Sequence, residues 1–313
     1  MRNRYLRKFK NFLSWSVEEV KKYGFVLGSV DILYFLIDKL VRWIYTLCHD
    51  NPVSIKLFES STFFVLCSDK GIGVDLRLLR KREPIITDIL MNLLKNDNRL
   101  EKKVFLDVGA NLGYYSVILG KNFRKVIAVE PYPKICPLLK KNLKTNKIVS
   151  RVLCVAATEQ NIEDIGFLEN RRGSNLGKVV VSDKDVAIKV KGVPFKDLLK
   201  KYKPVFVKMD IEGYEYNLLN AEDYPHLPSY LFVEIHFKEL GKLKSIHLLN
   251  NLAKKGYVIK YAVEEDKHVI PFPSRRGVIC KDCSISDFIK SYPDYLEGAG
   301  EGAIEFLFVL KKA

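Results

Sequence analysis

The sequence lacks several features that would place it in a class at once. Among its 313 residues, no apolar run reaches the eighteen or so uncharged positions that a membrane span needs. The basic start MRNRYLRKFK resembles the beginning of a secretory signal, but Glu18, Glu19, Lys21 and Lys22 interrupt the apolar segment that would follow. The sequence therefore predicts an intracellular, cytoplasmic chain.

Cysteine is sparse and scattered. Six cysteines occur, and only Cys280 and Cys283 form a C-x-x-C pair. A zinc ribbon needs a second pair, so we expect no zinc there and favour a local disulfide or plain loop residues. Cys154 falls in an apolar segment, which is typical of a buried reduced thiol.

Positive charge is abundant. The chain has 52 Lys and Arg against 37 Asp and Glu, which gives a net charge of +15. Nucleic acid, an anionic membrane surface and an acidic glycan fit that charge equally well. The 48% hydrophobic and 28% charged residues are typical of a globular protein long enough for one large domain with an appendage.

The stretch from Val104 to Glu130 predicts a strand, a glycine turn, a helix and a second strand. VFLDV is a short apolar run typical of a strand buried on both faces, with Asp107 at its carboxyl end. Residues 112–119 form the expected helix, and residues 125–129 the second strand. The turn between the first strand and the helix consists of Gly109, Ala110, Asn111, Leu112 and Gly113. Its small residues let a ligand lie against backbone N–H groups.

Glu130 ends the second strand, where a carboxylate can accept hydrogen bonds from two ribose hydroxyls. The dinucleotide fingerprint G-x-G-x-x-G is incomplete here, because only Gly109 and Gly113 are available. A wider turn fronted by Asp107 suits a nucleoside ligand with a cationic amino group and no phosphates. S-adenosylmethionine (SAM) fits this description, and a strand-turn-helix without any ligand is the alternative.

Three segments together resemble the FkbM family of SAM-dependent methyltransferases, over about residues 83–313. They are DVGANLGYYS, the AVEP that contains Glu130, and VKMDIEGYE at residues 207–215. The resemblance implies an O-methyltransferase that acts on a hydroxyl of a sugar, glycan, glycolipid or secondary metabolite. Positions that match the family pattern are Asp107, Gly109, Gly113 and Glu130 on the cofactor side, and Asp210, Glu212, Gly213, Glu215 and Glu234 after later strands.

The expected fold is α/β, a doubly wound, Rossmann-like class I methyltransferase sheet of seven strands. The remaining strands are predicted at residues 151–156, 205–209, 230–235, 257–263 and 304–310, and the resemblance implies that the last is antiparallel and lies beside the fifth. Ligands of such sheets lie at the carboxyl ends of the strands, so Ala156 and Ala157 should flank the adenine. Short strands are expected within residues 163–190, and residues 264–302 form an insertion.

Residues 1–82 are predicted to form an appendage of helices and short strands before the methyltransferase domain at residues 83–313. Apolar positions between Ile32 and Cys48 have helical spacing. We expect this stripe either to pack on the catalytic domain or a second subunit, or to lie on an anionic membrane with the basic N-terminus on the headgroups. Packing is the favoured alternative. Residues 54–79 predict two or three strands, the third at residues 71–76, and Pro84 begins a helix.

Four candidate catalytic groups follow two strands expected to be neighbours: Asp210 and Glu212 in D-x-E, and Glu234 and His236 in E-x-H. In one mechanism, His236 is the general base, with a pKa near neutrality that suits proton abstraction from an alcohol. In the other, Asp210, Glu234 and His236 hold a divalent cation that lowers the pKa of the acceptor hydroxyl. The metal-free version is favoured. Glu212 and Gly213 could instead simply begin the next helix, where the helix dipole favours the charge of Glu212.

Two further functions remain open. The positive charge and the basic helix expected at residues 133–144 suit an RNA methyltransferase. Nucleic acid is the less favoured partner, because neither N/D-P-P-Y nor a Pro-Cys nucleophile occurs. A non-catalytic protein that keeps the SAM pocket is the third hypothesis.

Overall fold

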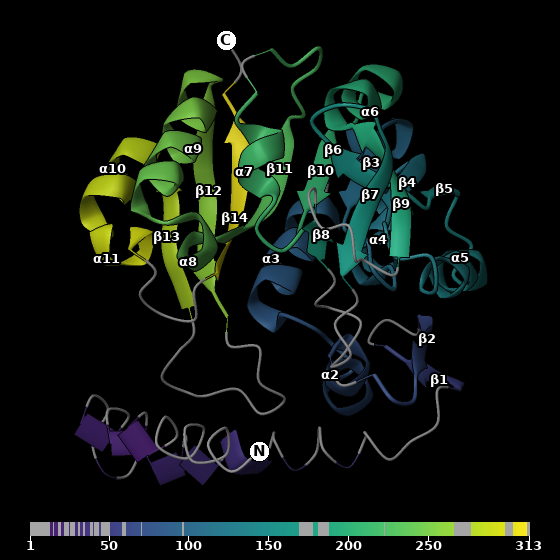
Figure 1. The fold of residues 1–313 in the computed structure, drawn as a ribbon, viewed down its shortest axis with the longest axis horizontal. Helices are drawn as coiled ribbons and strands as arrows, with labels where there is room; N and C mark the ends of the chain where they lie inside the picture. Colours follow the sequence, from purple (N-terminus) through teal and green to yellow (C-terminus); the bar gives the residue numbers. More distant parts are fainter. Residues whose placement is uncertain are drawn as a thin grey trace.

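The computed structural model describes residues 51–57, 61–69, 71–95, 97–168, 178–180, 188–221, 223–265, 277–297 and 303–311, with scattered helical positions between 13 and 44. A central sheet carries helices on both faces (Figure 1). Within these residues, no helix combines the length and apolar character needed to cross a membrane.

The central sheet has eight strands in the order β13-β12-β14-β11-β10-β3-β4-β5. Their bounds are β3 Val104–Val108, β4 Lys125–Val129, β5 Ser150–Leu153, β10 Phe206–Met209, β11 Tyr230–His236, β12 Tyr257–Glu264, β13 Gly277–Cys283 and β14 Ala303–Leu310. The five strands from β11 to β5 pair in parallel, and β14 pairs antiparallel with β11. The predicted doubly wound sheet with an antiparallel last strand is therefore confirmed, and β13 adds an eighth strand inside the predicted insertion.

Two hydrophobic cores lie on opposite faces of this sheet, since successive strand side chains point to opposite sides. Phe105 belongs to one core, and Leu106 and Val108 belong to the other. The first core includes residues of α3 (Pro84–Lys95), α4 (Tyr114–Ile118) and α5 (Cys136–Thr145). The second includes residues of α6 (Phe195–Tyr202), α7 (Glu215–Leu219), α8 (Phe237–Leu240), α9 (Lys242–Lys254), α10 (Ile285–Ser291) and α11 (Pro293–Leu296). The polar edge of the sheet lies between the two cores.

A second sheet of four strands has the order β6-β9-β7-β8. It contains β6 (Ala156–Thr158), β7 (Ile162–Leu168), β8 (Lys178–Val180) and β9 (Ile188–Pro194), which are the short strands expected in this region. The predicted third strand at residues 151–156 is wrong at its end. β5 stops at Leu153, and Ala156 and Ala157 instead pair with Gly192 and Val193 in the second sheet.

The strand predicted at residues 71–76 is also wrong, because Ile72–Leu79 forms helix α2. Two interactions explain the difference. Asp69 Oδ1 and Oδ2 accept hydrogen bonds from the N–H groups of Gly71 and Gly73, which satisfies the start of the helix. Arg77 donates to the carbonyl oxygens of Leu66 and Cys67 and ties the helix to the preceding strand.

Strands β1 (Pro52–Lys56) and β2 (Thr62–Leu66) pair antiparallel in a hairpin that forms a sheet of its own. The hairpin is docked on α5, where Asn142 Oδ1 and Asn146 Oδ1 accept the N–H groups of Phe64 and Thr62 at 2.7 and 3.1 Å. Phe63 and Val65 are buried in the core that also holds α3 and α5. The boundary at residue 82 stays a prediction.

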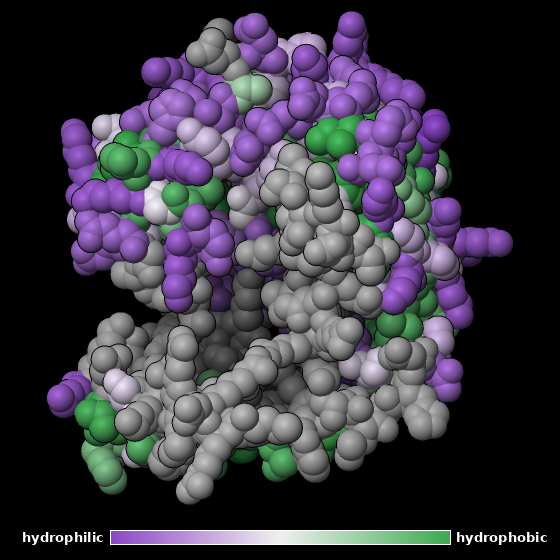
Figure 2. Space-filling view, in the orientation of Figure 1, coloured by the Kyte–Doolittle hydropathy of each residue, from purple (hydrophilic) through white to green (hydrophobic). Residues whose placement is uncertain are grey.

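The N-terminal helical segment exposes apolar side chains. Leu33, Leu36, Leu40 and Ile44 have helical spacing, and about half of each side chain is exposed. Green, hydrophobic atoms are visible along this segment at the foot of the molecule, whereas the upper body shows mainly purple, hydrophilic ones (Figure 2). Whether a second subunit or an anionic membrane covers this stripe stays a prediction; Arg2 to Lys10 lie outside the described residues.

The cysteines depart in part from the sequence interpretation. Cys280 and Cys283 form the favoured local disulfide. Cys154, predicted to be a reduced thiol, instead forms a disulfide with Cys136 across a Cα–Cα distance of 6.2 Å. The two cysteines are 18 positions apart, and helix, loop and β-strand lie between them, so their proximity depends on how α5 packs beside β5.

Gly109 follows β3 and lies against the backbone of Asp210, which follows β10, and this contact yields the first prediction. A Cβ there would lie 1.9 Å from the carbonyl oxygen of Asp210, at a φ of +74°. Gly241 has nearly the same φ, +73°, and a Cβ there would meet none of the described atoms within 4 Å. Gly241→Ala should cost about 1–2 kcal/mol of unfolding free energy from backbone strain alone, and Gly109→Ala clearly more. Urea unfolding measures both, and equal losses would contradict this close approach.

Candidate active site

A cleft opens at the carboxyl ends of the central strands, beside the switch in strand order between β3 and β10. It is lined by six of the eight predicted cofactor residues: Gly109, Ala110, Asn111, Glu130, Ala157 and Asp210. The glycine turn, the end of β4 and the end of β10 therefore meet in one place. Ala157 reaches the cleft from the second sheet, which places it beside the site by a different route from the one predicted.

The other two predicted cofactor residues lie beneath the lining. Gly113 has a φ of +86° and begins α4, and a Cβ there would meet Leu139 Cδ1 at 2.5 Å. Asp107 is 1% exposed and accepts a hydrogen bond from Ser116 Oγ at 2.6 Å. Burial raises the pKa of Asp107, although Lys208 and Ser116 oppose that shift. Gly113 and Asp107 thus support the glycine turn through contacts with α4 and α5 but do not line the cleft.

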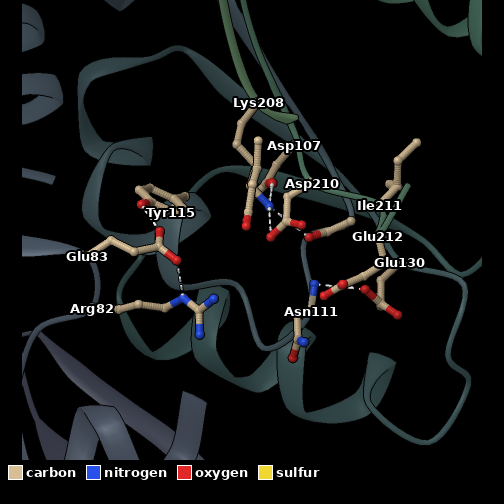
Figure 3. Close-up of polar contacts among 12 residues, drawn as sticks. Arg82, Glu83, Asp107, Asn111, Tyr115, Glu130, Lys208, Asp210, Ile211 and Glu212 are labelled. Atoms are coloured by element: carbon tan, nitrogen blue, oxygen red, sulfur yellow. Dashed lines mark hydrogen bonds and ion pairs between the residues drawn. The ribbon is translucent and has the colours of Figure 1, made fainter. Parts of the chain in front are cut away.

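Glu130 joins the end of β4 to the glycine turn (Figure 3). Its Oε2 accepts the N–H of Asn111 and its Oε1 the N–H of Tyr132, both at 2.8 Å. Each carboxylate oxygen keeps a second lone pair, so the group can still accept hydroxyl protons from a ligand in the cleft. Burial raises the pKa of Glu130 to about 7, against the lowering effect of the two backbone N–H groups.

Lys208 is a central residue that the sequence interpretation missed. Its ammonium donates to the Gly109 carbonyl oxygen at 3.0 Å and lies 3.6 Å from Asp210 Oδ2 and 3.9 Å from Asp107 Oδ1 (Figure 3). Burial alone would lower the pKa of Lys208, but the carboxylates of Asp210 and Asp107 raise it by more. The pKa is therefore raised overall, and the ammonium keeps its charge. A lone lysine in the apolar run VFVKM was the available signal, because a buried lysine requires acidic partners.

Arg82 also lines the cleft, and the sequence analysis predicted no role for it. Its Nε donates to Glu83 Oε1 at 2.7 Å, and the Tyr115 hydroxyl donates to the other oxygen of Glu83 (Figure 3). Burial lowers the pKa of Arg82, but Glu83 and Asp75 reverse this and raise it overall. A fixed cation therefore borders the cleft opposite the glycine turn.

The D-x-E segment leaves β10 in a tight turn. Glu212 has a φ of +57°, in the left-handed region, and both Asp210 and Glu212 line the cleft. Glu215 closes the turn, since its Oε1 accepts the N–H groups of Ile211 at 2.9 Å and Gly213 at 3.2 Å. Helix α7 begins only at Glu215, so Glu212 is a turn residue rather than part of a helix.

His236 lies behind this turn at the end of β11, and neither it nor Glu234 lines the cleft. Its Nδ1 faces Glu215 Oε1 at 3.4 Å, and its Nε2 lies 3.5 Å from Glu212 Oε2 and 3.6 Å from Glu234 Oε1. Burial lowers the pKa of His236, but the carboxylates of Glu215 and Glu234 outweigh it and raise the pKa to about 9. The expected pKa near neutrality is therefore wrong, and an unliganded His236 is protonated at neutral pH.

Two groups of side chains in the described residues have the spacing of metal ligands. Asp210, Glu212 and His236 form one, and Glu83, Glu234 and Glu305 form the other. The second group consists of acids alone. The first combines two carboxylates that line the cleft with the imidazole of His236. The predicted trio of Asp210, Glu234 and His236 is thus regrouped, with Glu212 in place of Glu234.

The strand order, the switch point and a glycine turn bounded by acids at two strand ends define a SAM-dependent methyltransferase of the Rossmann-like class I fold. Residues 107–259 match the family described as the methyltransferase FkbM domain. The chain therefore carries an FkbM methyltransferase domain over these residues, which confirms the resemblance for this range and leaves it an expectation for residues 83–106 and 260–313. None of the curated proteins compared with the chain matches it in sequence.

Solved structures give distant likenesses. A SAM-dependent methyltransferase from Agrobacterium tumefaciens is 10% identical with a TM-score of 0.47, covering 85% of this chain and 72% of its own. The M. jannaschii TYW2 protein in complex with AdoMet is 15% identical with a TM-score of 0.41, covering 84% and 89%. The precorrin-6y C5,15-methyltransferase from Geobacter metallireducens is 9% identical with a TM-score of 0.38, covering 72% and 88%. Sequence identities and TM-scores this low support no inference about the substrate of this chain.

The raised pKa of Glu130 predicts how SAM binding depends on pH. Hydrogen bonds from ribose hydroxyls favour the carboxylate, and Glu130 loses its charge as the pH falls through about 7. The Kd for SAM should therefore rise as the pH falls from about 8 to about 6, approaching tenfold per unit below the pKa. Isothermal titration calorimetry measures it.

Glu130→Gln is the matched control for this titration. It should bind SAM more weakly at pH 8 and lose the pH dependence that Glu130 causes, while any titration of SAM itself is common to both proteins. Glu163→Gln, at an exposed residue paired with Lys191, should behave like the unaltered chain. The same pH profile in Glu130→Gln and the unaltered chain would contradict the role of Glu130.

Proposed function

We propose that the chain is an O-methyltransferase that transfers the methyl group of SAM to a hydroxyl of a sugar, glycan, glycolipid or secondary metabolite. The observation that carries the proposal is that Asp210 and Glu212 line the same cleft as the glycine turn and Glu130. Methyl transfer from a sulfonium needs the acceptor oxygen held near the methyl carbon and its proton removed. Carboxylates at the cleft edge can do both for a hydroxyl.

Asp210 and Glu212 are the groups that contact the acceptor in this proposal, because they line the cleft. Glu234 and His236 lie behind them and act by positioning: His236 lies between Glu212 and Glu215, and Glu215 fixes the turn through two backbone N–H groups. The FkbM domain supports the choice of a hydroxyl, as the family resemblance implies O-methylation.

The net charge of +15 favours RNA as a second candidate substrate. Sequence-specific readers of bases stack aromatic or guanidinium groups on them. The cleft offers Tyr114, Tyr115, Tyr214 and Arg82, but Tyr115 and Arg82 are both engaged by Glu83. The hydroxyl acceptor is therefore preferred.

Labelled SAM incubated with the chain and a cell lysate, later separated into lipid, glycan, RNA and small-molecule fractions, tests the proposal. Label should enter a hydroxylated glycan, lipid or small molecule and survive mild alkali, since a methyl ether is stable where a methyl ester hydrolyses. Label that ribonuclease releases would instead establish the RNA alternative. Binding of SAM without any transfer would support a non-catalytic protein.

Glu212→Gln tests the assignment of the acceptor side. The change removes a proton acceptor at the cleft edge and should lower kcat by about 10²–10⁴-fold. The Kd for SAM should change little, because the ribose contact lies at Glu130. Glu163→Gln makes the same chemical change at an exposed site and should leave kcat unaltered. An unchanged kcat in Glu212→Gln would remove Glu212 from the mechanism.

A further inference from the structure

The environment of His236 does not fit an ordinary hydrogen-bonded histidine. The residue is 7% exposed, and its Nδ1 makes no hydrogen bond of ordinary length. Its Nε2 lies 3.5 Å from Glu212 Oε2 and 3.6 Å from Glu234 Oε1. Hydrogen bonds from N–H to oxygen are about 2.7–3.2 Å long, so these contacts are too long for direct bonds.

Those separations do fit atoms that bind one ion together. Ligand atoms lie about 2.0–2.2 Å from a small divalent cation, and therefore roughly 3.0–3.6 Å from their neighbours around it. Asp210, Glu212 and His236 each offer one ligand atom, and these atoms all lie within 4.8 Å of one another. Asp210 and Glu212 follow β10 and His236 ends β11, so the three groups come together at the ends of two paired strands.

Glu215 supplies the second observation. It is fully buried, and its Oε1 faces His236 Nδ1 at 3.4 Å while two backbone N–H groups hold that oxygen in place. A histidine that binds a metal through one nitrogen typically donates its other N–H to a carboxylate, which fixes the ring and its tautomer. Glu215 is the carboxylate that Nδ1 faces, at 3.4 Å rather than at hydrogen-bond length, and an Nδ1–H turned toward it would leave the Nε2 lone pair directed at Glu212 and Glu234.

We propose that Asp210, Glu212 and His236 bind a divalent cation at the edge of the SAM cleft, with Glu215 as the carboxylate that orients His236. One imidazole with carboxylate oxygens suits a six-coordinate ion such as Mn²⁺, whose remaining positions stay open to water or an acceptor. Four carboxylates, of Asp210, Glu212, Glu215 and Glu234, would share its charge.

The consequence for chemistry rests on the proposed O-methyl transfer. Asp210 and Glu212 line the cleft, so an ion that they hold would be within reach of an acceptor hydroxyl. A hydroxyl bound to a divalent ion loses its proton more readily than a free one. A carboxylate of the same cluster would take that proton, and no separate histidine base is required.

Titration of the full chain with Mn²⁺, after treatment with EDTA and buffer exchange, tests the site directly. The electron paramagnetic resonance signal of free Mn²⁺ should fall with a stoichiometry of a single site per chain. Glu215→Gln should weaken Mn²⁺ binding about 10–100-fold, and Glu212→Gln and His236→Gln should weaken it further. His247→Gln alters an exposed histidine that contacts the Tyr216 hydroxyl and should leave the affinity unchanged.

The titration needs neither SAM nor an acceptor, so it can fail or succeed independently of O-methyl transfer. Calorimetric SAM binding by each variant verifies that it is folded, and Glu212, in a surface turn, gives a variant with little risk to folding. Absence of Mn²⁺ binding by the unaltered chain would overturn the proposal. Equal affinities in His236→Gln and His247→Gln would overturn it too.

Discussion

The buried ammonium of Lys208 is the contact on which the rest of the site depends. Strand register places Lys208 directly opposite Asp107, so one cation on β10 meets an acid on β3. Removing one partner of such a buried pair typically costs about 3–5 kcal/mol, because the other charge is left uncompensated. Since Lys208 also donates to the Gly109 carbonyl, the same charge holds the glycine turn against the strand ends. The glycine turn and the end of β10 are thus joined through one side chain.

Three of the seven described non-glycine residues with positive φ lie at the cleft or next to a residue that lines it. Asn111, Glu212 and Glu83 adopt positive φ values of +50°, +57° and +46° although none is a glycine. Each is held by strong contacts: the Asn111 N–H by Glu130, the turn at Glu212 by Glu215, and Glu83 by Arg82 and Tyr115. Such conformations persist where surrounding structure fixes them and are common at functional sites. The polar network therefore fixes the backbone as well as the side chains.

Strands buried on both faces were predictable from sequence, because an apolar run such as VFLDV indicates a buried strand without knowledge of which segments pack against it. Glu130 was predictable for the same reason, as it ends such a run. Helix α2 was not, since it depends on Asp69 and Arg77 contacting the chain beside them. The disulfide of Cys136 with Cys154 and the pKa of His236 were not predictable either. Both arise from segments brought together by the sheet order, which periodicity does not encode.

The overall charge and the local charge of this chain act over different distances. A net charge of +15 attracts anionic molecules over about a Debye length, roughly 8–10 Å at ordinary salt. At the acceptor edge, however, Asp210, Glu212, Glu215 and Glu234 surround the imidazole of His236 within short distances. Under the proposed O-methyl transfer, these carboxylates would accept a hydrogen bond from a neutral hydroxyl, and the positive surface would attract an anionic molecule that carries that hydroxyl.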